Sequence, residues 1–352
     1  MSRFINQNYA SLEAYTPGEQ PKDMKYIKLN TNESPYPPSF GVLKAVEENA
    51  DKLNLYPDPE CAELKDELAK LYGVNRENVY VSNGSDDILN FFFLGFCDGG
   101  AVFPDITYGF YKVYAELYGV DYKKIPLLED FTIDPADYMN AGKNVVIANP
   151  NAPTGLTLDI EKIEEILKSN KENMVLVDEA YVDFGGESCI PLTKKYDNLL
   201  VVGTFSKSRS MAGARLGFAI ADREIISDLE KIKYSTNPYC INRLTLAAGI
   251  AAVKDNGYYM DNCKLVIAAR DYTTAALRTL GFRVLDSKAN FIFAESDAIK
   301  GRELYEKLKA RGILVRYFGS DRISNFVRIT IGTKEQMEAL VSAVSDILGG
   351  QK

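Results

Sequence analysis

Short runs of β-branched residues alternate with longer amphipathic stretches between residues 79 and 221, and this alternation constrains the fold more than any other feature of the chain. In a parallel sheet, each buried strand is a short apolar run that a covering helix joins to the next strand. We expect strands at residues 79–82, 101–104, 144–149, 174–178, 199–205 and 217–221, with a helix at 158–170. The pattern predicts an α/β architecture with a mainly parallel central sheet flanked by helices.

The C-terminal part of the chain indicates a smaller α+β domain. A long helical pattern after Tyr258 contains no Gly or Pro before Gly281, and the strand-like stretches NFIFAE and NFVRITIGT then flank a further helix. The Pro-rich stretch at residues 31–40 is typical of an extended crossing segment, because proline disfavours the helical conformation. We therefore expect a large domain at residues 37–257 and a small domain built from residues 1–36 and 258–352.

The composition excludes several classes of function. The chain has no histidine, which removes Ser-His-Asp and Cys-His catalysis and His-ligated metal sites, and we expect no metal. Its net charge of −8 comes from mixed acidic and basic residues, without a basic stripe for nucleic acid. The longest strongly apolar stretch, residues 88–97, is too short for a membrane span. Catalysis must therefore use Lys, Tyr, Asp, Glu or a cofactor.

The cysteines and the first residues indicate a cytoplasmic protein. The five cysteines lack C-x-x-C spacing, which fits free thiols in a reducing compartment. The first stretch, MSRFINQNYASLEAY, has neither the apolar core of a signal peptide nor the Arg-rich character of a transit peptide.

Polar side chains follow three of the expected strands, at the sheet edge where doubly wound folds bind ligands. The turn NGSDD opens a helix at Ser85 whose free N–H groups favour a phosphate, although Ser85 or Asp86 could equally be a plain N-cap. Asp178 ends a second strand, and Lys207 follows a third, with Arg215 further on. A lysine condenses with aldehydes, a carboxylate keeps a pyridine nitrogen protonated, and a helix N-terminus with an arginine holds a phosphate. Together these residues predict a site for pyridoxal 5′-phosphate.

Several stretches resemble motifs of the fold type I aminotransferases. TFSKSRSMAGARLGF around Lys207 resembles their pyridoxal-lysine motif, and DEAY (178–181) and the turn PTG resemble further cofactor motifs. YTPGEQP, LNTNESPYPP and LYPDP are similar to the N-terminal signature of histidinol-phosphate aminotransferases, and GILVR and VRITIGT match as well. The resemblance runs through nearly the whole chain and implies the fold type I architecture of pyridoxal-phosphate enzymes.

The resemblance implies a role for each matched cofactor residue. Lys207 would bind the cofactor aldehyde and move a proton, Asp178 would pair with the pyridinium nitrogen, and Tyr181 would hydrogen-bond the ring oxygen O3′. Tyr108 would stack on the ring, although ordinary core packing is its alternative. The phosphate would be held by Gly84, Ser85, Asp86, Thr204, Ser206 and Arg215. Tyr56 would reach the same phosphate from a neighbouring subunit, which makes a homodimer part of the mechanism.

The resemblance also implies where the small-molecule amino donor and 2-oxo acid acceptor bind. Arg328 matches a carboxylate-binding arginine, and Arg316 matches a second arginine typical of the histidinol-phosphate branch. Two guanidinium groups suit a dianionic phosphate better than a single carboxylate. Tyr15 and Asn290 lie in matching stretches, where a substrate contact and a structural role are both open. Arg209 is expected to be a surface charge.

The chain departs from the family at the turn NPNAPTG. The family has an asparagine immediately before PTG that bonds O3′, whereas this chain has Ala152 there and Asn151 one place earlier. Asn151 would reach the cofactor only if the loop is re-registered. Otherwise Tyr181 holds O3′ alone, and the pKa of the imine nitrogen at Lys207 rises slightly.

The implied reaction is a transamination in histidine biosynthesis, in which glutamate and imidazole-acetol phosphate give 2-oxoglutarate and histidinol phosphate. An aromatic amino-acid aminotransferase and a threonine-phosphate decarboxylase are alternatives on the same fold. A nucleotide-binding oxidoreductase would share the strand-helix pattern, but the chain lacks G-x-G-x-x-G after the first strand. A non-catalytic pyridoxal-binding regulator would need a DNA-binding module, for which the expected domains leave no room.

Overall fold

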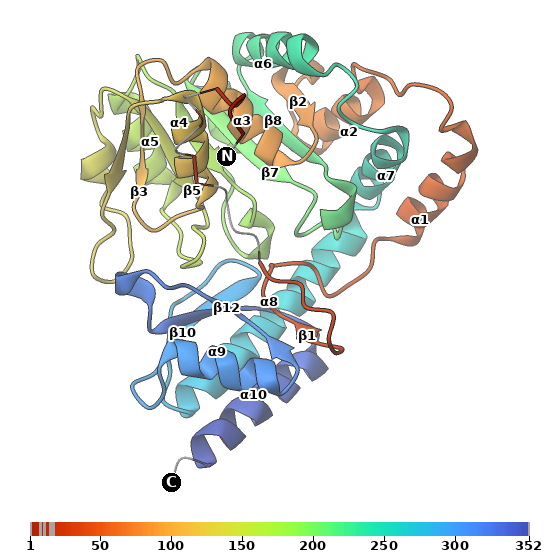
Figure 1. Ribbon diagram of the computed structural model, residues 1–352. Helices are drawn as coiled ribbons and strands as arrows, with labels where there is room; N and C mark the ends of the chain where they lie inside the picture. The colour runs from red at the N-terminus through yellow and green to blue at the C-terminus, as the bar shows by residue number, and fades with distance from the viewer. Residues whose placement is uncertain (1, 7–8, 10–11, 14–17, 351–352) are drawn as a thin grey trace.

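A sheet of seven strands forms the centre of the upper part of the molecule in the computed structural model, which describes residues 2–6, 9, 12–13 and 18–350 (Figure 1). The strand order is β2-β8-β7-β6-β5-β3-β4. The strands are β2 (Val79–Ser82), β3 (Ala101–Pro104), β4 (Tyr122–Ile125), β5 (Asn144–Ala148), β6 (Val175–Asp178), β7 (Leu199–Thr204) and β8 (Gly217–Ala221). β8 is antiparallel to β2 and β7, and the other neighbours are parallel. The predicted mainly parallel sheet is therefore confirmed.

Six of these strands agree with the predicted ranges to within one residue at each end. The prediction missed β4, whose sequence YKKI carries two exposed lysines, Lys123 and Lys124. β4 lies at the edge of the sheet, where lysines discourage pairing with another strand. An edge strand of this kind lacks the apolar run by which the buried strands are recognised.

Helices cover both faces of the sheet because successive strand side chains point to opposite sides. In β5, Val145 and Ile147 join one core cluster with α2, α5 and α7, whereas Val146 and Ala148 join another with α3, α4 and α6. The helices of this part are α1 (Phe40–Glu47), α2 (Ala62–Tyr72), α3 (Ser85–Gly95), α4 (Phe110–Tyr118), α5 (Ile160–Ser169), α6 (Arg223–Thr236) and α7 (Arg243–Lys254).

The lower part of the molecule is α+β, and the long helix α8 runs into it from the upper part (Figure 1). Its four-stranded antiparallel sheet has the order β12-β13-β10-β9, and β1 pairs in parallel with β11. The elements are β1 (Ile27–Lys28), α8 (Asn256–Thr279), β9 (Arg283–Val284), β10 (Phe291–Glu295), α9 (Gly301–Ala310), β11 (Ile313–Leu314), β12 (Arg316–Tyr317), β13 (Phe326–Thr330) and α10 (Lys334–Gly349). The domain bounds at residues 37 and 257 stay a prediction.

The N-terminal segment crosses between the two parts without forming a helix, as predicted for residues 31–40, until α1 begins at Phe40. The Asn32 backbone N–H donates to Thr330 Oγ1 in β13 at 2.9 Å, and the Ser39 N–H donates to Tyr259 Oη in α8 at 3.0 Å. The Asn32 side chain also donates to Tyr181 Oη at 3.0 Å, and Ser210 Oγ donates to Ser34 Oγ at 2.9 Å, which hold the segment beside the edge at which β6 and β7 end.

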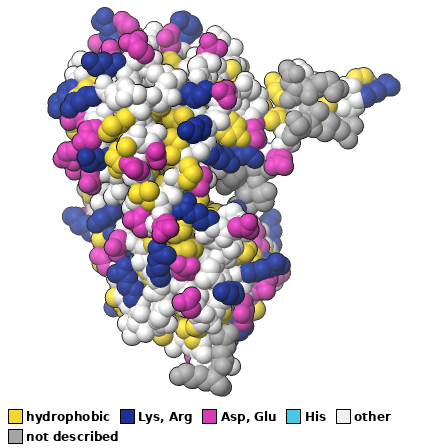
Figure 2. Space-filling view, turned by 90° about the vertical axis from the view of Figure 1, so that its left-hand side faces the viewer, with side chains coloured by type: hydrophobic (Ala, Val, Ile, Leu, Met, Phe, Trp, Pro, Cys, Tyr) yellow, Lys and Arg dark blue, Asp and Glu magenta, His cyan; other side chains and the backbone are white. Residues whose placement is uncertain are grey.

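Acidic and basic side chains are interspersed over the face of the molecule that Figure 2 shows. In the part of the chain that the structure describes, no helix combines the length and the apolar character that crossing a bilayer requires.

Candidate active site

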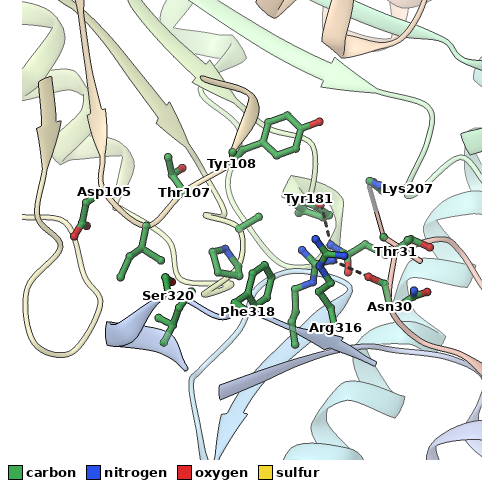
Figure 3. A pocket seen from close by; sticks show the side chains of 18 residues that line it. Asn30, Thr31, Asp105, Thr107, Tyr108, Tyr181, Lys207, Arg316, Phe318 and Ser320 are labelled. Carbon is green, nitrogen blue, oxygen red and sulfur yellow. Dashed lines mark hydrogen bonds between the residues drawn. The ribbon is translucent and has the colours of Figure 1, made fainter. Parts of the chain in front are cut away.

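Two cavities share walls at the edge where the parallel strands end. The larger has a volume of about 410 Å³ and the smaller about 90 Å³, and Tyr108, Ala152, Tyr181 and Lys207 line both. In Figure 3, Lys207 enters from the loop after β7, whereas Arg316 comes from the lower sheet. The shared space therefore lies between the two parts of the molecule.

Lys207 is positioned by the buried strand that precedes it. All six residues of β7 are buried, and the chain turns immediately afterwards, with the Met211 N–H donating to the Phe205 carbonyl at 3.0 Å. The Lys207 Nζ lies 5.8 Å from the centre of the Tyr181 ring. The lysine is half-buried, so its amine reaches both cavities while its backbone stays fixed.

The smaller cavity ends at the N-terminus of α3, where the chain offers several hydrogen-bond donors. Gly84 caps the helix with φ +83°, a conformation that favours glycine. A side chain at Gly217 in β8 would collide with the Ser85 backbone nitrogen, so glycine allows the strand to pass close to the helix start. The other donors on the cavity wall are the side chains of Ser85, Thr204, Ser206 and Arg215. Helix N–H groups, hydroxyls and a guanidinium together form a cradle for an anion.

Asp86 orients two neighbours of this cradle. Its Oδ1 accepts a hydrogen bond from Tyr108 Oη at 2.9 Å, and its Oδ2 accepts one from Arg215 Nη2 at 2.9 Å. The Asp86 carboxylate would repel a phosphate. The part of Asp86 that can bind an anion is therefore its backbone N–H, which lies at the N-terminus of α3.

Asp178 is the buried carboxyl group of the smaller cavity, with 5% of its surface exposed. Burial raises its pKa to about 6, and hydrogen bonds from the Tyr111 hydroxyl and the Ala180 N–H oppose that rise. These two donors hold its Oδ2 at 2.9 Å and its Oδ1 at 3.1 Å. A carboxylate fixed in this way suits a protonated ring nitrogen.

Tyr181 is held by a polar cluster that joins β13 to the N-terminal segment. Its hydroxyl accepts a hydrogen bond from Asn32 Nδ2 at 3.0 Å, and Asn32 Oδ1 accepts one from Thr330 Oγ1 at 3.0 Å. Asn290 is buried and does not line either cavity; its Nδ2 donates to the Asn32 carbonyl at 2.9 Å. The structure thus brings Asn290 to the site only through Asn32.

Two arginines line the larger cavity. Arg316 of β12 and Arg328 of β13 are paired across the strands, and both are half-buried. Their guanidinium carbons lie 5.7 Å and 5.6 Å from the centre of the Phe318 ring, and Arg328 Nη2 donates to the Asn30 carbonyl at 2.9 Å. Two adjacent guanidinium groups attract an anionic ligand to this end of the cavity.

Tyr56 and Asn151, like Asn290, are predicted site residues that do not line the two cavities. Tyr56 is 77% exposed and stacks on Tyr239 with ring centres 4.5 Å apart. Asn151 is buried, and its Nδ2 donates to the Ile106 carbonyl at 3.0 Å and to Thr154 Oγ1 at 3.1 Å. Tyr15 lies outside the described residues. Asn151 thus braces the turn that carries Ala152 to the cavity wall, and the predicted effect of Ala152 on the imine pKa stays a prediction.

The prediction that Arg209 is a surface charge is wrong. Only 4% of Arg209 is exposed, and its Nη1 donates to Asn256 Oδ1 at 2.6 Å. Its guanidinium also lies 5.7 Å from the centre of the Tyr259 ring. The first turn of α8 packs over the loop after Lys207 and covers this arginine, a contact between distant parts of the sequence.

Several residues of the site were not predicted from the sequence. Asn30, Asn32 and Phe318 line the larger cavity, and Tyr111 holds Asp178. Tyr111 lies in the first turn of α4, three residues after Tyr108, which precedes the helix, and its N–H donates to the Tyr108 carbonyl at 3.2 Å. Asn32 has φ +57°, which asparagine tolerates better than most residues. The closeness of Tyr111 to Tyr108 in the sequence and the asparagine-rich LNTN run were therefore the available signals.

The chain matches the model of one protein family over most of its length. The family is described as aminotransferase class I and II, and the match covers residues 24–344. The sheet, the lysine at a strand end and the anion cradle are the features that such an enzyme needs. The chain belongs to the class I and II aminotransferases, a family of pyridoxal-phosphate enzymes.

Its relatives narrow the assignment within that family. The histidinol-phosphate aminotransferase of Brachyspira hyodysenteriae is 55% identical over 352 residues and 99% of each chain. The one from Marinomonas sp. is 51% identical over 353 residues, covering 99% of this chain and 100% of the relative. The solved histidinol-phosphate aminotransferase of Clostridium acetobutylicum is 25% identical with a TM-score of 0.85, covering 92% of this chain and 99% of that one. Within the family, the chain groups with the histidinol-phosphate aminotransferases.

The residues of the smaller cavity fit pyridoxal phosphate. A histidinol-phosphate aminotransferase of Sinorhizobium meliloti, with a TM-score of 0.85 and 24% identity over 93% of this chain and 92% of that one, was solved in complex with this cofactor. Here Ser85, Thr204, Ser206 and Arg215 line the cavity at the N-terminus of α3, and these donors suit the phosphate. Asp178 and Lys207 offer a carboxylate and an amine on the same cavity, which suit a ring nitrogen and an aldehyde.

Proposed function

We propose that this aminotransferase transfers an amino group from glutamate to imidazole-acetol phosphate, giving 2-oxoglutarate and histidinol phosphate in histidine biosynthesis. One observation carries the proposal: Lys207 lies where a cavity with an anion cradle and a buried carboxylate joins a larger cavity with two arginines. The first cavity suits the cofactor and the second suits an anionic substrate.

Bound pyridoxal phosphate supplies an electron sink for the charge that develops on the substrate α-carbon. Lys207 would bind the cofactor aldehyde and move the proton at the substrate α-carbon. Asp178 would keep the ring nitrogen protonated, and Tyr181 would donate a hydrogen bond to the ring oxygen O3′. Tyr108, oriented by Asp86, would cover one face of the ring. The phosphate would be held by Gly84, Ser85 and Asp86 through their backbone, and by Thr204, Ser206 and Arg215.

Arg316 and Arg328 bind the substrate anion. Both the phosphate of histidinol phosphate and the γ-carboxylate of glutamate present oxygens to guanidinium groups, so one pair of arginines can serve both half-reactions. Tyr15 would add a hydroxyl near the phosphate of the substrate. Asn290 acts indirectly, because its hydrogen bond fixes the Asn32 carbonyl beside the cavity.

The proposed assembly is a cytoplasmic homodimer in which Tyr56 reaches the cofactor phosphate of the neighbouring subunit. Tyr56 is 77% exposed. Arg243 Nη2 donates to its backbone carbonyl at 2.6 Å, which fixes the backbone of Tyr56 at the surface. Four large apolar side chains are exposed between residues 40 and 55, and a fifth belongs to the stacking partner of Tyr56: Phe40, Leu43, Leu53, Leu55 and Tyr239. We call this set the α1 face. A second copy of the chain is the partner that would bury these side chains and also complete the site.

The test follows the visible absorption band of the purified protein reconstituted with pyridoxal phosphate. Histidinol phosphate should convert the cofactor to its amine form at far lower concentration than L-phenylalanine does. Lys207→Ala should abolish the band, whereas Lys264→Ala, at an exposed lysine of α8, should leave it unchanged. Conversion by phenylalanine alone would instead indicate an aromatic aminotransferase, and release of carbon dioxide from phosphothreonine would indicate a decarboxylase. A band that survives Lys207→Ala would contradict the assignment of Lys207.

A further inference from the structure

A buried tyrosine that belongs to none of the recognised motifs lies against Asp178. Tyr111, in the first turn of α4, has no exposed surface, and its hydroxyl donates to Asp178 Oδ2 at 2.9 Å. The Ala180 N–H donates to Oδ1 of the same carboxylate at 3.1 Å. Each carboxylate oxygen can accept two hydrogen bonds, so both retain capacity for a ligand in the smaller cavity.

The carboxylate needs this support because its surroundings disfavour charge. The pKa of Asp178 is raised to about 6, mainly by burial and to a smaller extent by the negative charge of Asp86. The hydrogen bonds from Tyr111 and Ala180 and the positive charge of Lys207 act in the opposite direction. A partner for a protonated ring nitrogen has to remain ionised at neutral pH, and the Tyr111 hydroxyl favours that form.

The hydroxyl of Tyr111 is suited to remain a donor. Burial and the neighbouring Asp178 raise its pKa well above its ordinary value, so it stays protonated at physiological pH. Its ring also packs edge-to-face on Tyr108, with ring centres 5.7 Å apart and an angle of 86°. One turn at the start of α4 thereby braces both the aromatic side chain expected over the cofactor ring and the carboxylate expected at its nitrogen.

We propose that Tyr111 is a positioning residue of the transamination, whose hydroxyl fixes the orientation of the Asp178 carboxylate and keeps it ionised, so that the ring nitrogen of pyridoxal phosphate stays protonated. The proposal rests on the proposed function, because it assumes that the cofactor binds with its nitrogen at Asp178. Without the hydroxyl, the carboxylate becomes more basic and takes the shared proton from the ring nitrogen.

The experiment compares the wild type with Tyr111→Phe, each reconstituted with pyridoxal phosphate labelled with ¹⁵N in the ring. At neutral pH the wild type should show the ¹⁵N chemical shift of a protonated pyridine, and Tyr111→Phe should move it toward that of the neutral ring. Equilibrium dialysis should show roughly tenfold weaker cofactor binding, since a hydrogen bond to a charged group is lost. The matched control is Tyr138→Phe, which removes a buried hydroxyl without a hydrogen-bond partner among the described residues and should change neither readout.

A second variant separates the hydrogen bond from simple packing and covers a failure of Tyr111→Phe to fold. 3-Fluorotyrosine incorporated at position 111 keeps the ring and the hydroxyl donor at the same distance from Asp178, and its ¹⁵N shift should lie near the wild-type value. A Tyr111→Phe protein with the wild-type ¹⁵N shift would overturn the proposal, and so would a 3-fluorotyrosine protein whose ring nitrogen is neutral. If the reconstituted wild type showed no visible absorption band that depends on Lys207, the proposed function would be contradicted. The inference about Tyr111 would then be contradicted as well.

Discussion

At the residue scale, the burial of an acidic side chain beneath the site destabilises the folded state once that side chain ionises. Glu179 follows Asp178, is 4% exposed and accepts a hydrogen bond from Ser188 Oγ at 2.6 Å. Burial raises its pKa to about 7, whereas an unfolded glutamate has an ordinary, lower value. A carboxyl group whose pKa is higher in the folded state favours folding when protonated, and that contribution is lost as the pH rises through the folded pKa.

The Glu179→Gln variant of the cofactor-free protein should therefore lose much of the pH dependence of its unfolding free energy between about pH 4.5 and pH 7. Above that window it should be more stable than the wild type by up to about 3 kcal/mol, because no buried charge forms. Urea unfolding at a series of pH values measures this. Glu165→Gln, at an exposed glutamate of α5, is the control and should leave the slope unchanged. A wild-type slope in Glu179→Gln would show that Glu179 does not titrate in this range.

At the element scale, the anion cradle depends on how closely β8 passes the start of α3. The Gly217→Ala variant should push the two apart, since its methyl group would collide with the Ser85 nitrogen and the Gly84 carbonyl carbon. We expect a loss of about 1 to 3 kcal/mol in unfolding free energy and at least tenfold weaker cofactor binding. Denaturant unfolding and cofactor titration measure the two effects.

Gly213→Ala is the matched control for this prediction. Its methyl group would meet no atom within 4 Å, and Gly213 lies in the same loop region as Arg215. It should retain wild-type stability and cofactor affinity. Equal behaviour of the two variants would mean that the approach of β8 to α3 does not shape the cradle.

At the scale of the whole molecule, the α1 face would link assembly to cofactor binding in the proposed homodimer. Leu55→Glu should convert the homodimer to a monomer of 39.2 kDa, because a charge placed in an apolar interface is costly to bury. The monomer should also bind pyridoxal phosphate more weakly, roughly tenfold, since it lacks the partner's tyrosine at the phosphate. Sedimentation velocity and cofactor titration measure both properties.

Leu128→Glu tests whether any exposed leucine gives the same result. Leu128 is 47% exposed and follows β4, at the opposite edge of the sheet from β2. This variant should remain a dimer with normal cofactor affinity. A wild-type protein that sediments as a monomer with full activity would contradict the role of Tyr56 in a partner's site.

The sequence by itself determined the large sheet and the residues at its strand ends. Apolar runs and helical periodicity are local properties, and the carboxyl ends of parallel strands meet at one edge whatever the rest of the chain does. Asp178 and Lys207 could therefore be assigned to one site before the fold was known. The edge strand β4 escaped prediction because its side chains face solvent instead of a core.

Only the tertiary structure decided which distant residues touch. Tyr111 lies 67 positions from Asp178, and Asn32 lies 298 positions from Thr330, yet each pair shares a hydrogen bond. The burial of Arg209 likewise depends on α8 crossing the loop after Lys207. Such contacts depend on how the helices and the crossing segment pack against each other, which local propensity does not specify. The residues at the strand ends thus carry the reactive groups of the site. The hydrogen bonds that orient these groups come from long-range packing.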